Sequence, residues 1–571
     1  MATVTKTPAG AVTPQQRVRP PITRLGIGLG ALAVGALVLV VVSWRATGFG
    51  VGVLFSGLGD MWTFLRSTLP PHFSSADYSL GHMLGDVAST VSMAVLGTAL
   101  AMVLSIPLGF LAARNTTPHP VVRVMARTVV TACRAVPDIV FALVFREALG
   151  IGVLPGILAL GLHSIGMLGR LYGDGIEQVP AGPRQAVTAS GAGRLQTICA
   201  SVVPFASPQI LSNALYRLDI NLRSSVVLGF VGAGGIGFTL QAAMNTLQFR
   251  LAMGIVLVMT VLILIMELLS ALLRSALIGN DTVRTGRRWP SSRNSSPRER
   301  AGSRGNAMPF DADRVRPRWT GARVGRASAP YLVVIALGLA WWDAQVPVSE
   351  LLSSPGAIAR AVTQYFPPDF TTAGSQLRQG MWESFVTAVM GTFGGGLIAL
   401  AISFFAARNI ANPWVYRVVR VLLVIGRSIP ELIVAIMFVV AVGPGVLAGV
   451  FALIVGTIAF LAKLMADSIE EADPGPRGAI RSTGAGVGQE VVAAVVPPAL
   501  PGIVGNLLYM LDVNFRSSAL LGIVGAGGIG FLLAQTVQTF DYHTTGAIVT
   551  TTFVIVLLIE QLSNWARRAL S

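Results

Sequence analysis

RSSVVLGFVGAGGIGF occupies residues 223–238, and RSSALLGIVGAGGIGF occupies residues 516–531. Counted from Asp219 and Asp512, 15 of 20 positions are identical at a constant offset of 293. A repeat at so long a period indicates duplication of a whole folding unit. The same offset relates four pairs of residues further upstream: Pro204 and Pro497, Gly191 and Gly484, Arg184 and Arg477, and Arg134 and Arg427.

The duplication divides the chain into three parts. We predict a first repeat over residues 1–280 and a second over residues 329–571, each with about six membrane-spanning helices. Residues 281–328 are rich in arginine and serine and are interpreted as a disordered cytoplasmic linker. Because an even number of spans returns the chain to its starting side, both repeats are expected to insert in the same orientation. Equivalent loops then face the same compartment.

The composition indicates a membrane protein. Of 571 residues, 53% are hydrophobic and only 12% are charged, and the mean hydropathy is +0.68. A soluble protein would need more charge to cover its surface. Uncharged runs cover residues 25–42, 251–266 and 432–462, and a helix of about 20 apolar residues crosses a bilayer. We therefore predict an all-α integral membrane protein with about twelve transmembrane helices in two parallel six-helix repeats. The spans centre near Gly35, Leu100, Val130, Leu160, Ala214 and Leu262, and near Leu337, Ile398, Leu423, Leu453, Leu507 and Ile555.

The net charge of +16 comes almost entirely from arginine. Arginines cluster in the amino-terminal tail, in the linker and in the short loops after the second and fourth spans, which is the positive-inside pattern of cytoplasmic segments. We therefore expect a multi-pass membrane protein, surrounded by lipid, with both termini in the cytoplasm. Nucleic acid is not an expected partner. Cys133 and Cys199 lie in or beside apolar helices, so no disulfide is expected.

Both copies of GAGGIG satisfy G-x-G-x-x-G, the dinucleotide-binding fingerprint. That fingerprint follows a buried strand and is followed by an acid about 20 residues later. Here an apolar helix precedes the motif, and no acid stands at that distance, so a membrane oxidoreductase is the least favoured hypothesis. Two interpretations stay open: a re-entrant turn or gate along a pore, and tight helix packing alone. The glycines concerned are Gly232, Gly234, Gly235, Gly237, Gly525, Gly527, Gly528 and Gly530.

The fifth span of each repeat contains charged residues. Arg223 and Arg516 stand four residues after Asp219 and Asp512, so each pair can neutralise itself on a helix. Alternatively, the arginines and the serines beside them form a ring of donors for an oxyanion along a pathway. The two interpretations are compatible. The candidate pathway residues are Asp219, Asn221, Arg223, Ser224, Ser225, Asp512, Asn514, Arg516, Ser517 and Ser518.

The third span carries a second charged arrangement, RAVPD at residues 134–138 and RSIPE at residues 427–431. The prolines are expected to break the local helix bonding and expose backbone groups. Ion pairing between the arginine and the acid four residues later is favoured over a gating role. His163 has Gly456 as its counterpart and is expected to be a packed histidine.

The loop between spans four and five reads RQAVTASGAGRLQTICASVVP at residues 184–204 and RGAIRSTGAGVGQEVVAAVVP at residues 477–497. It resembles the EAA loop of ABC importer permeases in the spacing from its glycine to its proline, although Gln185 and Gly478 stand where that family usually has glutamate. In that family the loop forms the coupling helix, which inserts into a groove on the ATPase subunit. The coupling residues implied by the resemblance are Gln185, Ala186, Gly191, Gly193, Pro204, Gly478, Gly484, Gly486 and Pro497.

Further segments, RAVPDIVFALVF at residues 134–145 and LHSIGMLGRL at residues 162–171, are similar to phosphonate importer permeases of the PhnE type. The chain resembles a tandem fusion of two such units with the type I ABC importer permease fold. The resemblance implies a permease subunit for phosphonate, phosphate or phosphite in the bacterial inner membrane. It also implies an ATPase dimer on the cytoplasmic side, which holds ATP and Mg, and an external substrate-binding protein.

ATP hydrolysis is expected on a separate chain. Lys6 and Lys463 are the only lysines, and neither lies in a Walker A loop. We expect no catalytic residue, no metal and no cofactor on this chain. An ion-coupled secondary transporter with twelve spans is the alternative, which intramembrane acids such as Asp138 and Glu431 keep open.

Overall fold

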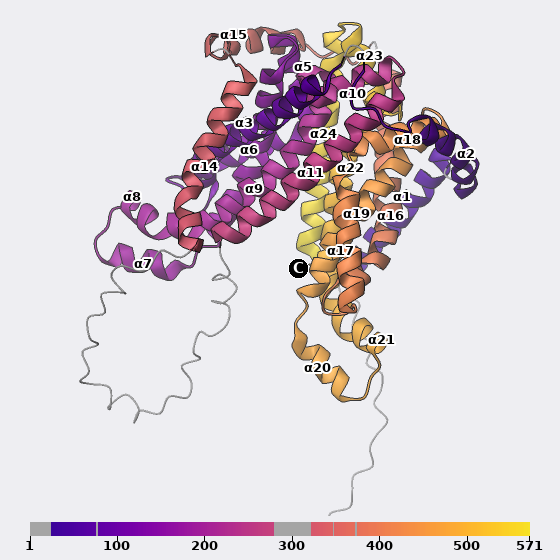
Figure 1. Cartoon of the computed structure of the whole chain (residues 1–571). Helices are drawn as coiled ribbons and strands as arrows, with labels where there is room; N and C mark the ends of the chain where they lie inside the picture. Colours follow the sequence, from indigo (N-terminus) through magenta and orange to yellow (C-terminus); the bar gives the residue numbers. More distant parts are fainter. Residues whose placement is uncertain are drawn as a thin grey trace, which may run out of the picture.

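The computed structural model describes residues 24–48, 50–75, 78–278, 321–346, 348–371 and 374–570. This part of the chain is helical, with one isolated β-bridge between Ser75 and Tyr78 (Figure 1). The all-α prediction is thereby confirmed. Most of the predicted linker lies outside the described residues, and helix α14 begins at Gly321, before the predicted start of the second repeat.

The two repeats contain corresponding helices in the same order. The first consists of α1 (Arg24–Thr47), α2 (Val51–Ser67), α3 (Leu80–Ala112), α4 (Pro120–Ala135), α5 (Asp138–Leu149), α6 (Val153–Glu177), α7 (Ala181–Ala189), α8 (Arg194–Thr197), η1 (Ile198–Val202), α9 (Val203–Leu228), η2 (Gly229–Ala233), α10 (Gly235–Asn245) and α11 (Phe249–Ile278). The second consists of α14 (Gly321–Ala344), α15 (Val348–Gln364), α16 (Gly374–Ala406), α17 (Pro413–Ser428), α18 (Glu431–Val442), α19 (Val446–Glu470), α20 (Pro474–Ser482), α21 (Val487–Glu490), η3 (Val491–Val495), α22 (Val496–Ile523), α23 (Ile529–Gln538) and α24 (Tyr542–Leu570).

Eight helices of the described part are long and apolar enough to cross a membrane, or ten if each of two bent pairs counts as one span. In α1 and α14 only shorter apolar stretches are described, Leu37–Thr47 and Tyr331–Ala344. The described residues therefore supply eight to ten of the twelve predicted spans.

The predicted third span is broken in both repeats. Helices α4 and α5 meet at 85°, and α17 and α18 meet at 80°. Pro137 and Pro430 stand at these corners, and each is followed by an acid in the first helical turn. Proline lacks an N–H and cannot continue the helix before it, and an acid stabilises the start of the next helix. The predicted break is thus confirmed.

Within each repeat, small residues allow the longest helices to lie close together. A Cβ added to Gly97 of α3 would lie 2.9 Å from the Cβ of Leu160 of α6, and one added to Gly161 would lie 2.6 Å from Leu100. In the second repeat, a Cβ on Gly391 would lie 2.5 Å from Leu453. In a membrane, where lipid is as apolar as leucine, such close packing is a main source of helix association.

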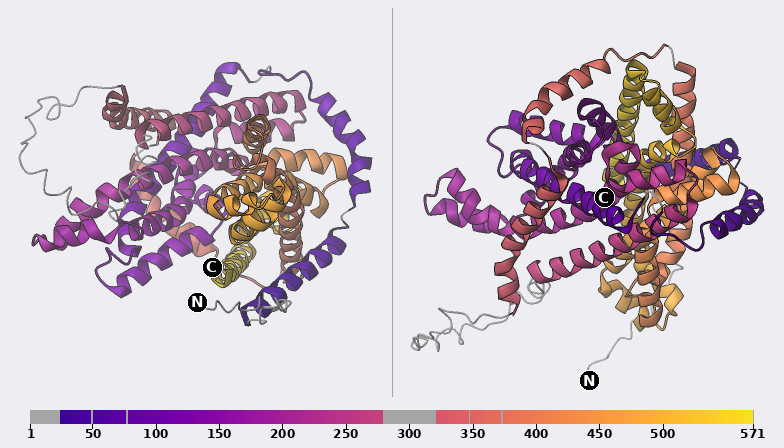
Figure 2. Two further views of the ribbon diagram at one scale, coloured as in Figure 1. Left: turned by 90° about the horizontal axis from the view of Figure 1, so that it is seen from below. Right: turned by 45° about the horizontal axis from the view of Figure 1, so that its top comes forward.

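The first two helices of each repeat pack on the other repeat. Helix α1 lies against α16 and α2 against α18, while α14 lies against α3 and α15 against α5. Figure 2 shows α1 and α2 on the outside of the orange helices of the second repeat. Ser92 of α3 donates a hydrogen bond to Asp343 of α14 at 2.7 Å. The two sequence repeats are therefore not two separate bundles, because they exchange their first helices.

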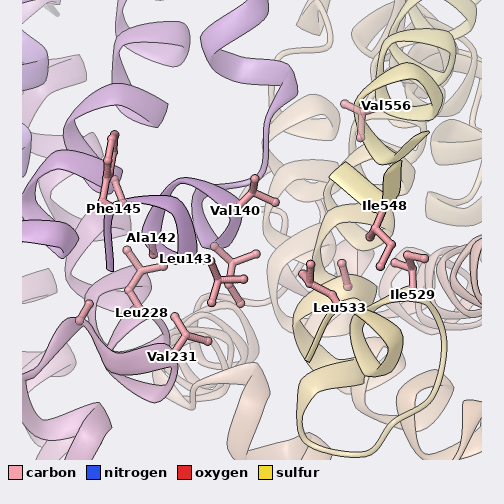
Figure 3. Close-up of a cluster of buried hydrophobic side chains, with 14 of the residues drawn as sticks. Val140, Ala142, Leu143, Phe145, Leu228, Val231, Ile529, Leu533, Ile548 and Val556 are labelled. Carbon is pink, nitrogen blue, oxygen red and sulfur yellow. The ribbon is translucent and has the colours of Figure 1, made fainter. Parts of the chain in front are cut away.

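A buried apolar cluster joins the two repeats. Its labelled side chains come from α5, α9 and η2 of the first repeat and from α23 and α24 of the second (Figure 3). Phe145, Leu228, Ile529 and Ile548 are each at most 7% exposed. Burial of these apolar side chains from both repeats stabilises the contact between the repeats, at the end of the molecule where α10 and α23 lie.

Candidate functional site

A cavity of about 480 Å³ lies between the repeats. Its wall comes from the bends of the third spans and from α6, α9, α19, α22 and α24, so both repeats contribute. Apolar residues supply part of the wall, but arginines and carboxylates are concentrated there. The polar and charged residues that line it are Arg134, Asp138, His163, Arg170, Arg217, Arg223, Ser224, Arg427, Glu431, Tyr509, Asp512, Arg516, Ser517, Glu560 and Ser563.

The predicted ion pairs of span five are present. Arg223 lies 3.1 Å from Asp219, and Arg516 pairs with Asp512. Arg223 also lies 3.6 Å from Glu267. Both arginines, the serines next to them (Ser224 and Ser517) and Asp512 line the cavity. Asp219 is buried and is not part of the lining. The role of these residues in translocation stays a prediction.

Other predicted pathway residues face neighbouring helices. Asn221 donates to the Thr98 hydroxyl at 2.9 Å and accepts from Ser164 at 3.0 Å. Asn514 makes the corresponding bond to Thr392 at 2.9 Å. Hydrogen bonds of this kind satisfy polar groups between membrane helices. The two serines, Ser225 and Ser518, donate to backbone carbonyls of their own helices. Four of the candidate pathway residues therefore face other helices or their own backbone and lie outside the cavity lining: Asn221, Ser225, Asn514 and Ser518.

The acids that pair with Arg134 and Arg427 were not identified from the sequence. Arg134 pairs with Glu560, and Arg427 lies 3.4 Å from Glu267. Each pair joins the third span of one repeat to the last helix of the other. Glu267 and Glu560 are separated by the repeat offset of 293, and each lies within an apolar run. A duplicated acid inside a membrane helix usually has a charged partner, so this pattern could have identified the two glutamates from the sequence.

The expected pairing inside RAVPD and RSIPE fails for a geometric reason. Residues four apart are neighbours only on a continuous helix, and the bend moves the acid into the next helix. There the Asp138 carboxylate accepts from the backbone N–H of Ile139 at 3.0 Å. His163, expected to be a packed histidine, lines the cavity, and its Nδ1 donates to the Val136 carbonyl at 3.0 Å.

We expect Glu267→Gln or Glu560→Gln to destabilise the fold. The side chains of these crossed pairs are at most 19% exposed, and removing one member of a buried pair typically costs about 3–5 kcal/mol. Thermal unfolding in detergent measures the loss, with Glu471→Gln at an exposed helix end as the control. Partial recovery in Glu267→Arg with Arg427→Glu would support the pairing, and unchanged unfolding temperatures in both single variants would contradict it.

The glycine motifs form sharp turns after span five. Gly232, Gly234 and Gly235 have φ values of 98°, 74° and 69°, and their second-repeat counterparts are also positive. Such conformations favour glycine. The turn is fastened by a bond from the Ile236 N–H to the Thr90 hydroxyl at 2.9 Å. The glycines therefore allow the chain to reverse direction and also allow the helices to pack closely. They lie outside the cavity lining, and a gating role stays a prediction.

The predicted coupling loops form two short helices on each repeat, α7 with α8 and α20 with α21. Both pairs protrude beyond the long helices at the same end of the molecule (Figure 1), as parallel repeats require. Gly191 and Gly484 stand between the helices with φ of 83° and 81°. All nine predicted coupling residues are exposed, and neither α7 nor α20 has a buried residue.

Arginines fasten the coupling loops to the helix ends above them. Arg184 donates to the Asn115 carbonyl at 3.3 Å, and Arg477 donates to the Asn409 carbonyl and pairs with Glu490. These carbonyls belong to the repeated AARN segments. Each predicted coupling loop is thus bonded directly to the end of a long helix of its own repeat.

The comparisons with known proteins agree with this architecture. The family model described as "Binding-protein-dependent transport system inner membrane component" matches residues 105–278 and 399–571, once in each repeat. The phosphate-import permease protein PhnE of Mycolicibacterium smegmatis is 43% identical over 531 residues, which cover 93% of each chain. The chain belongs to this transport family. It is a permease subunit of the ABC importer class, a multi-pass inner membrane protein with the type I importer fold.

Shorter relatives match part of the permease. The phosphite transport system permease protein PtxC of Stutzerimonas stutzeri is 37% identical over 246 residues, which are 43% of this chain and 88% of that protein. The solved structure of the MetNI methionine ABC transporter in inward-facing conformations is 27% identical and covers 35% of this chain, with a TM-score of 0.33. The first two helices of each repeat, which exchange between the repeats, lie outside the matched family segments.

Proposed function

We propose that this permease moves a phosphate-type oxyanion, namely phosphate, phosphite or a phosphonate, into the cytoplasm. The observation that carries the proposal is the cavity between the repeats with six arginines in its wall. Guanidinium groups suit tetrahedral oxyanions because their fork of N–H donors matches pairs of oxygen atoms. The names of the two relatives, a phosphate-import permease and a phosphite permease, support the same class.

The proposed machinery has two further components. An ATPase dimer, which binds ATP and Mg, docks on α7–α8 and α20–α21 from the cytoplasm, and a substrate-binding protein delivers the oxyanion at the opposite end. Both termini lie on the cytoplasmic side in this arrangement. The exposed coupling helices and their arginine ties support the docking, and the family description, which refers to binding-protein-dependent transport, supports the second component.

Uptake of radiolabelled phosphate, methylphosphonate and phosphite tests this proposal. The permease is produced with its ATPase and binding protein in cells that lack their own uptake systems for these anions. We expect uptake that is lost when the ATPase is inactivated and that survives collapse of the proton gradient while ATP is maintained. Uptake driven by an ion gradient in liposomes containing this chain alone would favour the secondary-transporter alternative, and absence of uptake for all three anions would overturn the substrate class.

A further inference from the structure

One arginine of the cavity wall differs from the others. Among the described residues, Arg217 has no carboxylate within ion-pair distance, although its side chain lines the cavity and the residue is only 3% exposed. The remaining cavity arginines are paired: Arg134 with Glu560, Arg170 with Glu560 and Asp174, Arg223 with Asp219 and Glu267, Arg427 with Glu267, and Arg516 with Asp512.

The contacts of Arg217 leave much of its donor capacity free. Its Nε donates to the Ser164 hydroxyl at 2.7 Å, and its Nη1 lies 3.1 Å from the Met167 sulfur, a weak acceptor. Its Nη2 is buried and has no hydrogen-bond partner among the residues that the structure describes. Burial of a charged group is costly unless a partner compensates it. The guanidinium is therefore held in place at one edge, while in the described part of the chain its other edge lacks a partner for its charge.

Arg217 breaks the symmetry of the repeats. At the offset of 293 its counterpart is Met510, and the counterpart of Met167 is Phe460. By contrast, the paired arginines of the third and fifth spans and the glutamates of the last helices are duplicated. The duplicated charges neutralise each other, either within one helix, as in the Asp–Arg pairs of span five, or between the repeats, as in the pairs made by Glu267 and Glu560. The uncompensated charge lies on the side of the first repeat alone.

Asp138 and His163 are two of the acceptors that share the cavity wall with Arg217. Asp138, like Arg217, belongs to the first repeat and lines the cavity, and within the described residues its carboxylate forms no ion pair. His163 uses Nδ1 to donate to a carbonyl, so in the neutral ring Nε2 is an acceptor. A carboxylate repels a fully ionised oxyanion but accepts a hydrogen bond from one that keeps a hydroxyl. Near neutral pH, inorganic phosphate keeps at least one proton and a phosphonate keeps one in part of its population, whereas sulfate keeps none.

We propose that the transported oxyanion binds off the pseudo-twofold axis in its monoprotonated form, with Arg217 as its guanidinium donor and Asp138 as the acceptor of its hydroxyl. This inference rests on the proposed function. It adds which residues contact the oxyanion and which protonation state of the oxyanion they bind. The site selects phosphate-type anions over sulfate within the permease itself, after any selection by the binding protein. Affinity is expected to be weak, because a conduit must release its cargo.

Thermal unfolding of the full chain in lipid nanodiscs tests the site without the binding protein. A ligand that binds only the folded state raises the unfolding temperature with its concentration. At ionic strength matched with chloride, inorganic phosphate should stabilise the wild-type permease and sulfate should not. Arg217→Met, which copies the residue of the second repeat, should lose the phosphate response. Arg217→Lys should keep the charge and require roughly tenfold more phosphate, since lysine lacks the fork.

Two further variants complete the experiment. Asp138→Asn should respond to sulfate as well as phosphate, because the repulsion is gone. Arg114→Met, at an exposed position outside the cavity, should keep the wild-type response. Equal phosphate responses in wild type and Arg217→Met, or equal responses to phosphate and sulfate in wild type, would overturn the proposal. If the wild-type permease takes up the oxyanions and Arg217→Met takes them up at the same rate, this site is rejected while the proposed function stands. If the wild-type permease takes up none of them, the proposed function itself is rejected.

Discussion

Gly237→Ala or Gly530→Ala is expected to abolish production of the folded permease. A Cβ at Gly237 would overlap the carbonyl oxygen of Val226, and one at Gly530 would overlap that of Ala519. Both obstacles are backbone atoms of the preceding long helix, so no side-chain rotation relieves them. Overpacking of this kind costs up to about 3 kcal/mol and occasionally more, and separation of α23 from α22 would also disturb the apolar cluster between the repeats.

The yield of monodisperse protein and its unfolding temperature in detergent measure this effect. Gly85→Ala is the matched control, because a Cβ at that helical position meets nothing within 4 Å. Alanine there should be neutral or stabilise the helix by up to about 1 kcal/mol. Wild-type yield and unfolding temperature for both Gly237→Ala and Gly530→Ala would show that the close approach of these helices is not required.

Gly191→Val together with Gly484→Val is expected to reduce oxyanion uptake at least tenfold while the membrane helices stay folded. Both glycines have left-handed φ values and nothing within 4 Å of an added Cβ. The cost is therefore conformational, about 1–2 kcal/mol at each loop and more for a β-branched side chain. A coupling loop that changes shape no longer fits the proposed ATPase, and the same loops have few contacts that would disturb the bundle.

Asparagine at the same two positions provides the control, since asparagine tolerates the left-handed conformation. Gly191→Asn with Gly484→Asn should keep most of the uptake and should co-purify with the ATPase. The valine pair should lose the ATPase and keep the wild-type unfolding temperature of the isolated chain. Retention of the ATPase by the valine pair would remove these loops from the docking site.

The order of helices, the breaks in the third spans and the Asp–Arg pairs of span five could all be predicted from the sequence. Each depends on neighbours in the chain: twenty apolar residues, a proline without an N–H, or charges four residues apart on one helix. Duplication made these patterns reliable, because each occurs twice at one offset. The resemblance in the coupling loops likewise rests on local spacing.

Only the tertiary structure decided which distant segments meet. The exchange of α1 and α14 between repeats, and the pairs Arg134–Glu560 and Arg427–Glu267, join residues far apart in the chain. Nothing in local periodicity separates Asn221, which bonds to Thr98 between helices, from Arg223, which lines the cavity two residues later. The same holds for Arg217, whose lack of a carboxylate partner within the described part of the chain is a property of the packed helices. Local geometry fixes helices and turns, whereas the compensation of a buried charge depends on which other helices pack around it.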